Sequence, residues 1–159
     1  MALPTTGAPA PEFTLQDHTG TEISLSDYQG EKNVLVYFYP KAMTPGCTVQ
    51  AQGLRDIAEQ LAGHDVVVFG VSPDPVKRLA KFVERDALNF QLLSDEDHSV
   101  ADAYGAWGPK KFMGKEFDGI LRTSYLVDKA GNLCEIINQF KTKDHHEVVL
   151  TTLQELGRW

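Results

Sequence analysis

The chain has 159 residues, of which 42% are apolar and 23% charged, and this length and composition predict one globular domain spanning residues 1–159. The formal net charge of -7 argues against a nucleic-acid partner or an anionic membrane surface, because both would repel the protein. We expect a cytoplasmic protein that contacts no membrane, because no apolar run approaches the ~20 residues of a membrane span, the N-terminus has no secretory pattern, and two cysteines are too few for a disulfide framework.

The N-terminal part of the chain predicts an extended segment followed by a β-hairpin. Residues 1–12 are rich in Pro and Ala and predict an extended lead-in. Apolar and polar residues alternate over residues 13–15 and 22–25, on either side of the turn sequence D-H-T-G. Alternation around such a turn is typical of two antiparallel strands.

The central feature of the sequence is an uninterrupted apolar and aromatic run over Val34–Tyr39. Such a run predicts a strand that is buried on both faces. Pro40 ends the strand, because proline has no N–H to donate to a sheet. A turn over residues 41–46 leads to Cys47. Beyond it, four apolar residues have the i, i+3, i+4 and i+7 spacing of an amphipathic helix: Leu54, Ile57, Ala58 and Leu61.

The rest of the chain alternates strand and helix patterns. Strands are predicted at residues 66–71, 90–93, 120–128 and 133–138, with the last two joined as a hairpin. Helices are predicted after residues 72–75, over residues 100–104 and from Asp144 onwards. Residues 106–119 show no clean period and are predicted to form a loop. We therefore expect an α/β fold, with a central mixed sheet flanked by helices and an N-terminal β-hairpin extension.

Cys47 falls at the junction between the central strand and the helix that follows it. The unpaired backbone N–H groups of a first helical turn carry partial positive charge, which favours a thiolate over a thiol. The thiolate is the form that acts as a nucleophile and that oxidants attack. Position alone leaves two interpretations open: a reactive cysteine, or a small buried apolar residue, which is what most free cysteines are.

The residues around Cys47 favour the reactive interpretation. The sequence P-K-A-M-T-P-G-C resembles the P-x-x-x-T-x-x-C signature of peroxiredoxins, and Y-F-Y-P-K-A-M-T-P-G-C-T-V-Q-A resembles their PrxQ (bacterioferritin comigratory protein) subfamily. The resemblance implies a thioredoxin-like fold and a peroxidase that reduces hydrogen peroxide and organic hydroperoxides through a cysteine sulfenic acid. It makes Cys47 the reacting sulfur, Thr44 a hydrogen-bonding partner of the peroxide, and Pro40 the cover of the pocket.

A thiolate needs a nearby cation, and the resemblance assigns this role to Arg122. The sequence G-I-L-R-T-S-Y-L-V-D over residues 119–128 resembles the family's G-I-x-R-x-x-F-L-[IV]-D segment. Without the resemblance, a solvated surface arginine is the ordinary interpretation. Arg55, in the helix after Cys47, is a rival cation for which we expect a surface or structural role.

The sequence departs from the subfamily pattern at the second cysteine. Many PrxQ proteins carry a resolving cysteine five residues after the reactive one, where this chain has Gln52, and the helices predicted at residues 76–86 and 100–104 contain none. Only Cys134 remains, in the predicted strand 133–138, and we favour a structural role for it. We therefore expect a one-cysteine cycle, in which an external thiol such as thioredoxin, glutaredoxin or glutathione reduces the sulfenic acid.

Other residues with ligand or docking chemistry predict no cofactor and no metal site. His145 and His146 lack further ligands at metal spacing and are expected at the surface. The acidic run at residues 95–97 lacks the spacing of a calcium loop. The aromatic and apolar residues of the predicted loop either bury in the core or dock a reductant protein, and we favour the core. These residues, with the lysines between them, are Trp107, Phe112, Met113, Lys110, Lys111 and Lys115.

Two other functions remain open. A thiol-disulfide oxidoreductase on the same fold needs C-x-x-C, and Thr44 stands where the first cysteine would be. A non-enzymatic binding module would carry an unreactive Cys47. The resemblance to PrxQ proteins also leads us to expect a monomer or a weak dimer.

Overall fold

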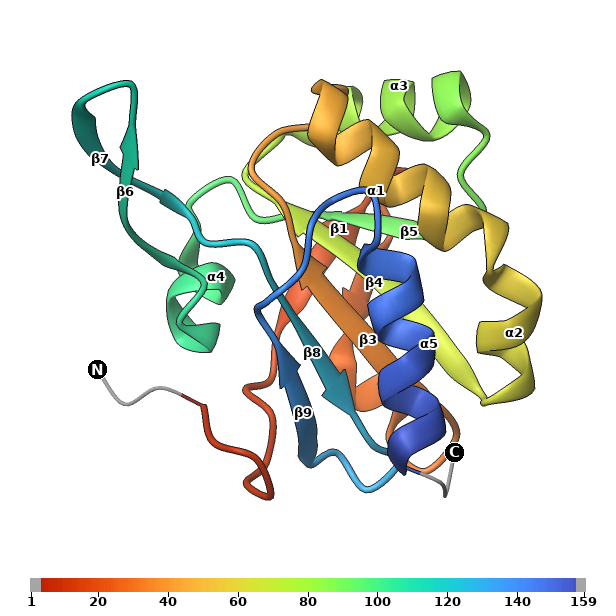
Figure 1. The fold of residues 1–159 in the computed structure, drawn as a ribbon. Coiled ribbons are helices and arrows are strands. Elements are labelled where there is room, and N and C mark those ends of the chain that lie inside the picture. The colour runs from red at the N-terminus through yellow and green to blue at the C-terminus, as the bar shows by residue number, and fades with distance from the viewer. Residues whose placement is uncertain (1–3, 157–159) are drawn as a thin grey trace.

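A computed structural model describes residues 4–156 and is built around a seven-stranded sheet (Figure 1). Its strands follow the order β2-β1-β5-β4-β3-β8-β9. Their bounds are β1 Thr14–Asp17, β2 Glu22–Ser24, β3 Asn33–Phe38, β4 Val66–Ser72, β5 Gln91–Ser94, β8 Thr123–Val127 and β9 Leu133–Ile137. A separate pair consists of β6 Trp107–Phe112 and β7 Lys115–Ile120. The helices are the 3₁₀ helix η1 Leu25–Tyr28, α1 Pro45–Asp56, α2 Ala58–Gly63, α3 Val76–Asp86, α4 Ser99–Tyr104 and α5 His145–Leu156. Residues 1–3 of the predicted lead-in lie outside the described range.

Strand β3 lies inside the sheet, and all of its residues are buried. It runs parallel to β4 and antiparallel to β8. Its side chains alternate between two apolar clusters, with Leu35 and Tyr37 in one and Val36 and Phe38 in the other. Because both faces of the strand are covered, the sequence shows a continuous apolar run instead of an alternation with polar residues.

Helices cover both faces of this sheet. On one face, α1, α2 and α3 contribute Leu54, Leu61 and Phe82 to the cluster that also holds residues of α5. On the other face, α4 and η1 contribute Tyr104 and Leu25. The β1–β2 hairpin extends the sheet beyond β5. The mixed strand directions and the two helical layers confirm the predicted α/β architecture with its N-terminal hairpin.

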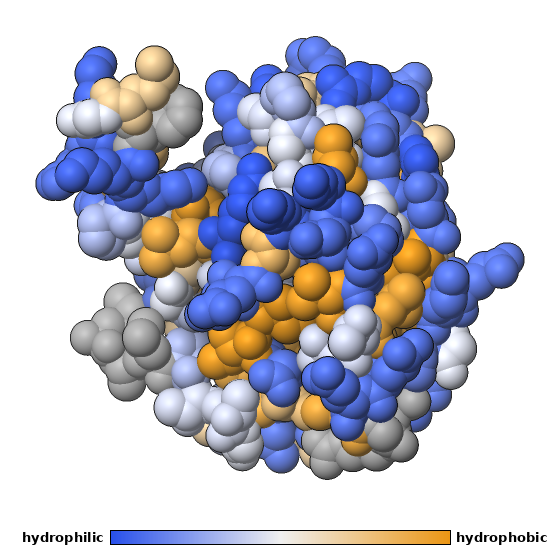
Figure 2. All heavy atoms as spheres, viewed as in Figure 1, coloured by the Kyte–Doolittle hydropathy of each residue, from blue (hydrophilic) through white to orange (hydrophobic). Residues whose placement is uncertain are grey.

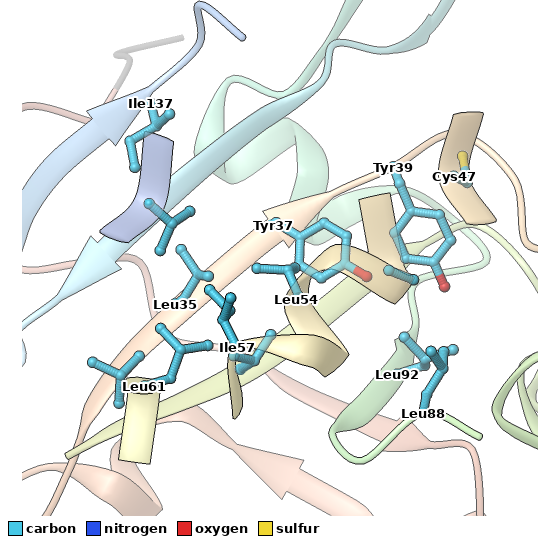
Figure 3. Close-up of a cluster of buried hydrophobic side chains, with 14 of the residues drawn as sticks. Leu35, Tyr37, Tyr39, Cys47, Leu54, Ile57, Leu61, Leu88, Leu92 and Ile137 are labelled. Carbon is cyan, nitrogen blue, oxygen red and sulfur yellow. The ribbon is translucent and has the colours of Figure 1, made fainter. Parts of the chain in front are cut away.

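The helix predicted after Cys47 is divided into α1 and α2. The two helices meet at Ile57, whose backbone has φ -103° and ψ 16°. The predicted apolar stripe still faces the core, since Leu54, Ile57 and Leu61 are buried. Figure 3 shows Cys47 at one end of this cluster, near Tyr39, and Leu61 at the opposite end. The break in the helix therefore leaves the position of Cys47 unchanged.

Residues 106–119, predicted to form a loop, instead provide most of the β6–β7 hairpin. The prediction was wrong because Gly108 and Pro109 interrupt the alternation by which a strand is recognised. Met113 and Gly114 have φ values of 51° and 77°, and two positive φ values are the mark of a type I′ hairpin turn. The hairpin projects from the body near α4 (Figure 1), and Figure 2 shows its outer part standing apart from the rest of the surface.

The strand predicted over residues 120–128 is also divided. β7 ends at Ile120 and β8 begins at Thr123. Between them, the N–H of Leu121 donates to the carbonyl of Ala106 over 2.7 Å, which ties the base of the hairpin to the end of α4. Arg122 therefore lies in the short connection between the hairpin and the main sheet.

Polar and apolar residues are unevenly distributed over the face of the molecule drawn in Figure 2. Most of the face in Figure 2 is hydrophilic, and apolar residues gather in a band across its middle, beside α5. In the part of the chain that the structure describes, no helix combines the length and the apolar character needed to cross a bilayer.

Candidate active site around Cys47

Cys47 lies in the first turn of α1, as its position after the central strand predicts. The helix has Thr44 as its N-cap and begins at Pro45. The N–H groups of Gly46 and Cys47 have no helical carbonyl one turn earlier to accept their hydrogen bonds, and Thr44 makes no side-chain bond that caps the helix. The positive end of the helix therefore lies at the Cys47 sulfur.

Arg122 brings a guanidinium group to this sulfur from the connection between β7 and β8. Its Nη2 donates to the Sγ of Cys47 over 3.2 Å. The missing side chain of Gly46 makes room for this approach, since a Cβ built there would lie 3.2 Å from the same nitrogen. Cys47 is only 1% exposed. A cation and a sulfur atom thus meet in a site that is nearly closed to water, where their attraction is stronger than at an exposed surface.

Gln50 is a site residue that the sequence analysis missed. Its Oε1 accepts a hydrogen bond of 2.8 Å from Nη1 of Arg122, and the residue is fully buried. The spacing offered a clue, because residues i and i+3 lie on one side of a helix and Gln50 follows Cys47 by three. Gln50 therefore holds one edge of the guanidinium while the other edge faces the sulfur.

Thr44 and Pro40 lie in the turn that leads into α1. The Oγ1 of Thr44 donates to the carbonyl of Lys41 over 2.9 Å, which leaves its lone pairs able to accept a hydrogen bond. Pro40 is half-buried and directly follows Tyr39, the last buried residue of the central run. The structure thus places Thr44 at the helix cap and Pro40 just beyond the end of β3, at the same edge of the sheet as Cys47.

Side chains at the end of β4 and just after it hold this turn in place. The carboxylate of Asp74 is nearly buried and accepts 2.7 Å hydrogen bonds from the N–H of Ala42 and the hydroxyl of Ser72. Arg78 forms an ion pair with Asp74 at 3.2 Å and donates to the carbonyl of Ala42 at 2.9 Å. With Ala42 fixed on both sides, the next residue, Met43, has a φ of 66°, which is uncommon for a residue with a side chain.

Two buried tyrosines lie beside the site on β3 and just after it. Burial is the main cause that raises the pKa of Tyr37 and of Tyr39 above the ordinary value of a phenol. Both side chains therefore stay neutral at physiological pH. They place uncharged groups at the Cys47 end of the cluster (Figure 3). Among the described residues, the charged group in contact with the sulfur is the guanidinium of Arg122.

His145 was expected at the surface, and this prediction was wrong. The residue is fully buried, and its Nε2 shares a 2.7 Å hydrogen bond with the hydroxyl of Ser124 on β8. Its ring also packs against Phe140 and Tyr37. Burial lowers the pKa of His145 to about 3. The error arose because the packing of the first turn of α5 on the sheet depends on tertiary structure. His146 is half-buried.

Gln52 and Arg55 connect α1 to the C-terminal end of α3. The Nε2 of Gln52, at the position where many PrxQ proteins have a resolving cysteine, donates to Oδ1 of Asp86 over 3.0 Å. Arg55 donates from Nη1 to the carbonyl of Asp86 over 2.7 Å. The expectation that Arg55 has a structural or surface role is consistent with these contacts, since the described hydrogen bonds of its guanidinium go to Asp86 and to its neighbour Asp56.

Cys134 lies near the opposite end of the sheet from Cys47. It follows Leu133, which pairs with Val127 on β8, and Val127 in turn pairs with Val34 at the start of β3. Cys47 comes after the other end of β3, at Phe38. Val34, level with Cys134, and Phe38 are separated along the strand by about 13 Å at ~3.3 Å per residue. A disulfide requires Cα atoms within about 7 Å.

The remaining candidates do not form a second centre. Trp107 is half-buried and stacks on His98 with ring centroids 3.8 Å apart. Met113 is 86% exposed, so the prediction that it buries in the core was wrong; the side chain of Phe112 lies outside what the structure describes. Within residues 4–156, no three His, Cys, Asp or Glu side chains are grouped as metal ligands would be.

Comparison with known proteins gives consistent matches along the chain. The profile of the AhpC/TSA family matches residues 6–136. Peroxiredoxin Bcp of Escherichia coli strain K12 is 53% identical over 146 residues, which cover 92% of this chain and 93% of that protein. The structure of the bacterioferritin comigratory protein of Xanthomonas campestris superposes with a TM-score of 0.87 at 26% identity, over 96% of this chain and 99% of the other. A mutant PrxQ of Xylella fastidiosa superposes with a TM-score of 0.90 at 27% identity, over 99% of both chains.

Proposed function

Because the chain belongs to the AhpC/TSA family and to its peroxiredoxins, which are thiol-dependent peroxidases, we propose that Cys47 is the sulfur that attacks the hydroperoxide. The likeness to PrxQ structures also confirms the predicted thioredoxin-like fold. The observation that supports the role of Cys47 most directly is the 3.2 Å contact between its sulfur and the guanidinium of Arg122. A guanidinium in contact with a sulfur atom stabilises negative charge on it, and the anionic sulfur is the nucleophile.

In the first step, the thiolate attacks the terminal oxygen of the hydroperoxide. The S–O bond forms as the O–O bond breaks, so the sulfur is oxidised to a sulfenic acid and the peroxide is reduced to water or an alcohol. Arg122 stabilises the negative charge that moves from the sulfur to the leaving oxygen. The leaving oxygen takes one proton from solvent. Thiolate, hydroperoxide and this proton together give the sulfenic acid and water or an alcohol.

Three further groups orient the peroxide. The Oγ1 of Thr44 accepts a hydrogen bond from the peroxide O–H, since its own proton is donated to Lys41. The N–H of Gly46 and that of Cys47 donate to the peroxide oxygens at the start of α1. Pro40 shields the reacting atoms from water. The positions of these groups at one edge of the sheet support these roles.

In the second step, an external thiol reduces the sulfenic acid. A first thiol displaces water and forms a mixed disulfide with Cys47, and a second thiol releases the Cys47 thiol and leaves as the external disulfide. Gln52 at the usual resolving position and the strand-length separation of Cys134 from Cys47 support this one-cysteine cycle. We further infer that the protein works in the reducing cytoplasm, as a monomer or weak dimer, with thioredoxin, glutaredoxin or glutathione as reductant.

The substrate range is proposed to include both hydrogen peroxide and organic hydroperoxides. The groups proposed to bind the peroxide act on the O–O bond, which hydrogen peroxide and organic hydroperoxides share. Support comes from the Xanthomonas campestris protein, whose structural work concerns its alkyl peroxide reduction activity.

The experiment compares wild type with Cys47→Ser and Cys134→Ser in peroxide turnover supported by an external thiol. We expect Cys47→Ser to be inactive and Cys134→Ser to turn over at the wild-type rate. Intact mass after one equivalent of peroxide should show one added oxygen on wild type. A loss of two hydrogens, or a covalent dimer that needs Cys134, would contradict the one-cysteine cycle. An active Cys47→Ser variant would contradict the assignment of the reacting sulfur.

A further inference from the structure

Lys110 extends diagonally across the β6–β7 hairpin. It pairs directly opposite Phe117, yet its stem lies over Gly119, two residues nearer the base. A Cβ built on Gly119 would be 3.2 Å from Cδ of Lys110 and 3.4 Å from Cε2 of Phe117. The hairpin enters the connection that carries Arg122 immediately after this point. Lys110 therefore points along the hairpin toward the active site and away from the exposed tip.

The charge of Lys110 lies in the electrostatic field of the site. The residue is half-buried, and burial together with the positive charge of Arg122 lowers the pKa of the Lys110 ammonium, while the negative charge of Cys47 acts in the opposite direction. By contrast, Lys32 and Lys129 both pair with Asp65. In the described part of the chain, no carboxylate lies within salt-bridge distance of Lys110.

A half-buried ammonium that faces a site and has no carboxylate partner is suited to bind an anion from outside. The aliphatic stem of Lys110 and the 48% exposed ring of Phe117 form an apolar surface next to that charge. The shape and chemistry fit a small molecule with an apolar part and a negative end. Nη1 and Nη2 of Arg122 are already engaged by Gln50 and Cys47, so the ammonium of Lys110 adds donors that a carboxylate can use.

We propose that Lys110 is a substrate-binding residue that takes the carboxylate of a molecule reacting at Cys47. This inference rests on the proposed peroxidase site. The carboxylate comes either from the hydroperoxide or from the external thiol, since both must reach the same sulfur. In either case, Lys110 selects among substrates by charge, whereas Arg122 acts on the sulfur and on every peroxide alike.

The test uses Lys110→Gln with Lys111→Gln as its matched control. Lys111 is exposed and adjacent on the same strand, so its side chain points to the opposite face of the hairpin. In the peroxide arm, a hydroperoxyalkanoic acid is compared with its methyl ester, with dithiothreitol as the reductant. In the thiol arm, mercaptoacetate is compared with 2-mercaptoethanol, with hydrogen peroxide as the oxidant. Lys110→Arg, which keeps the charge, is measured in both arms.

We expect Lys110→Gln to lower kcat/KM for the carboxylate-bearing member of one pair by about 5- to 10-fold relative to its neutral partner, the size of one partly exposed charge-assisted hydrogen bond. Lys111→Gln and Lys110→Arg should keep the wild-type ratio. The arm in which the ratio changes identifies the source of the carboxylate. Equal losses for charged and neutral members, or no change in either arm, would overturn the proposal. The neutral member of each pair still reports turnover at Cys47. A failure of the Lys110 proposal can therefore be distinguished from a failure of the peroxidase assignment.

Discussion

Arg122 and Cys47 are 75 positions apart in the sequence, yet the guanidinium of one donates to the sulfur of the other over 3.2 Å. The pairing of β3 with β8 brings them together. Phe38, near the end of β3, pairs with Thr123 at the start of β8. The turn to Cys47 leaves β3 at the same edge at which Arg122 enters β8. The antiparallel register therefore creates the contact.

Replacing Arg122 with Gln is expected to lower kcat/KM for hydrogen peroxide by roughly 100-fold or more. Removing one preorganised donor from developing charge costs on the order of 3 kcal/mol in other enzymes, which is about two powers of ten in rate. Rapid-mixing measurement of peroxide consumption in a single turnover provides the rate. The alkylation of Cys47 by iodoacetamide at a fixed pH should also be slower in the variant, because the cation beside the sulfur is gone.

Arg55→Gln is the matched control, since it removes the same charge from α1. The guanidinium of Arg55 bonds to the carbonyl of Asp86 and not to the sulfur. This variant should be less stable but should react with peroxide at nearly the wild-type rate. If the two variants lost activity equally, net charge and not the 3.2 Å contact would be responsible.

Gln50→Leu is expected to reduce the same rate by about 10-fold or more, because a hydrogen bond to a charged group contributes about 1.5–3 kcal/mol. Gln50 does not contact the sulfur in the described structure; it accepts from Nη1 of Arg122 and so positions that residue. Gln50→Asn keeps a neutral amide acceptor on the same side of the helix and should recover part of the rate. The rate of alkylation of Cys47 at a fixed pH is the diagnostic measurement: a merely structural residue would change stability and leave that rate unchanged.

The order of the elements was predictable because several patterns are strong over their whole length. The apolar runs of β3 and β4 are buried on both faces, and no local alternative competes with them. The position of Cys47 at the start of a helix was also predictable, because Pro40 ends the strand and a short turn separates it from the helix. The hairpin was not predictable, because Gly108 and Pro109 hide the alternation and only the pairing with β7 reveals the strand.

The partners within the site depended on tertiary structure. No local pattern distinguishes Arg122 from a surface arginine, and only the family resemblance and the β3–β8 register select it. Gln50 lies on a predictable side of α1, but its function depends on the arrival of Arg122 from another part of the chain. His145 looked like a surface residue for the same reason: its burial needs Ser124 on β8.

Asp74→Asn tests how the turn before α1 is held. The carboxylate of Asp74 accepts from Ala42 and Ser72 and pairs with Arg78, and it is only 6% exposed. The amide keeps the size but loses the charge and one acceptor. We expect the free energy of unfolding to fall by roughly 2 kcal/mol, the contribution of a buried hydrogen bond to a charged group, and peroxidase activity to fall with it because Thr44 is less well positioned.

Urea denaturation provides the measurement for this prediction. The control is Asp56→Asn, which alters a carboxylate on the surface of α1 whose ion pair with Arg55 is exposed. Such pairs contribute little, so the control should remain within the error of wild type. The account of the turn would be wrong if Asp74→Asn and Asp56→Asn had the same stability.

His145 makes the fold less stable as the pH falls. Burial lowers its pKa from 6.5 to about 3, so the folded state holds the neutral ring while the unfolded chain binds a proton below pH 6.5. Stability from this residue is therefore complete above pH 6.5 and is lost progressively as the pH falls toward 3. The slope is about 1.4 kcal/mol per pH unit for one proton at most.

His145→Gln separates this effect from the carboxylates that also weaken the protein in acid, because those groups are shared by both proteins. At pH 7.5, the variant should be less stable than wild type, since Gln fills the ring's place against Phe140 and Ser124 poorly. As the pH falls, only wild type loses the contribution of the neutral histidine, so the difference in the free energy of unfolding should shrink by roughly 1 kcal/mol by pH 5.5. Urea titrations at pH 7.5, 6.5, 5.5 and 4.5 measure it, with the pH 7.5 difference as the internal reference. A difference that stays constant over this range would mean that His145 takes up its proton in the folded state as readily as in the unfolded one, which its burial against β8 does not allow.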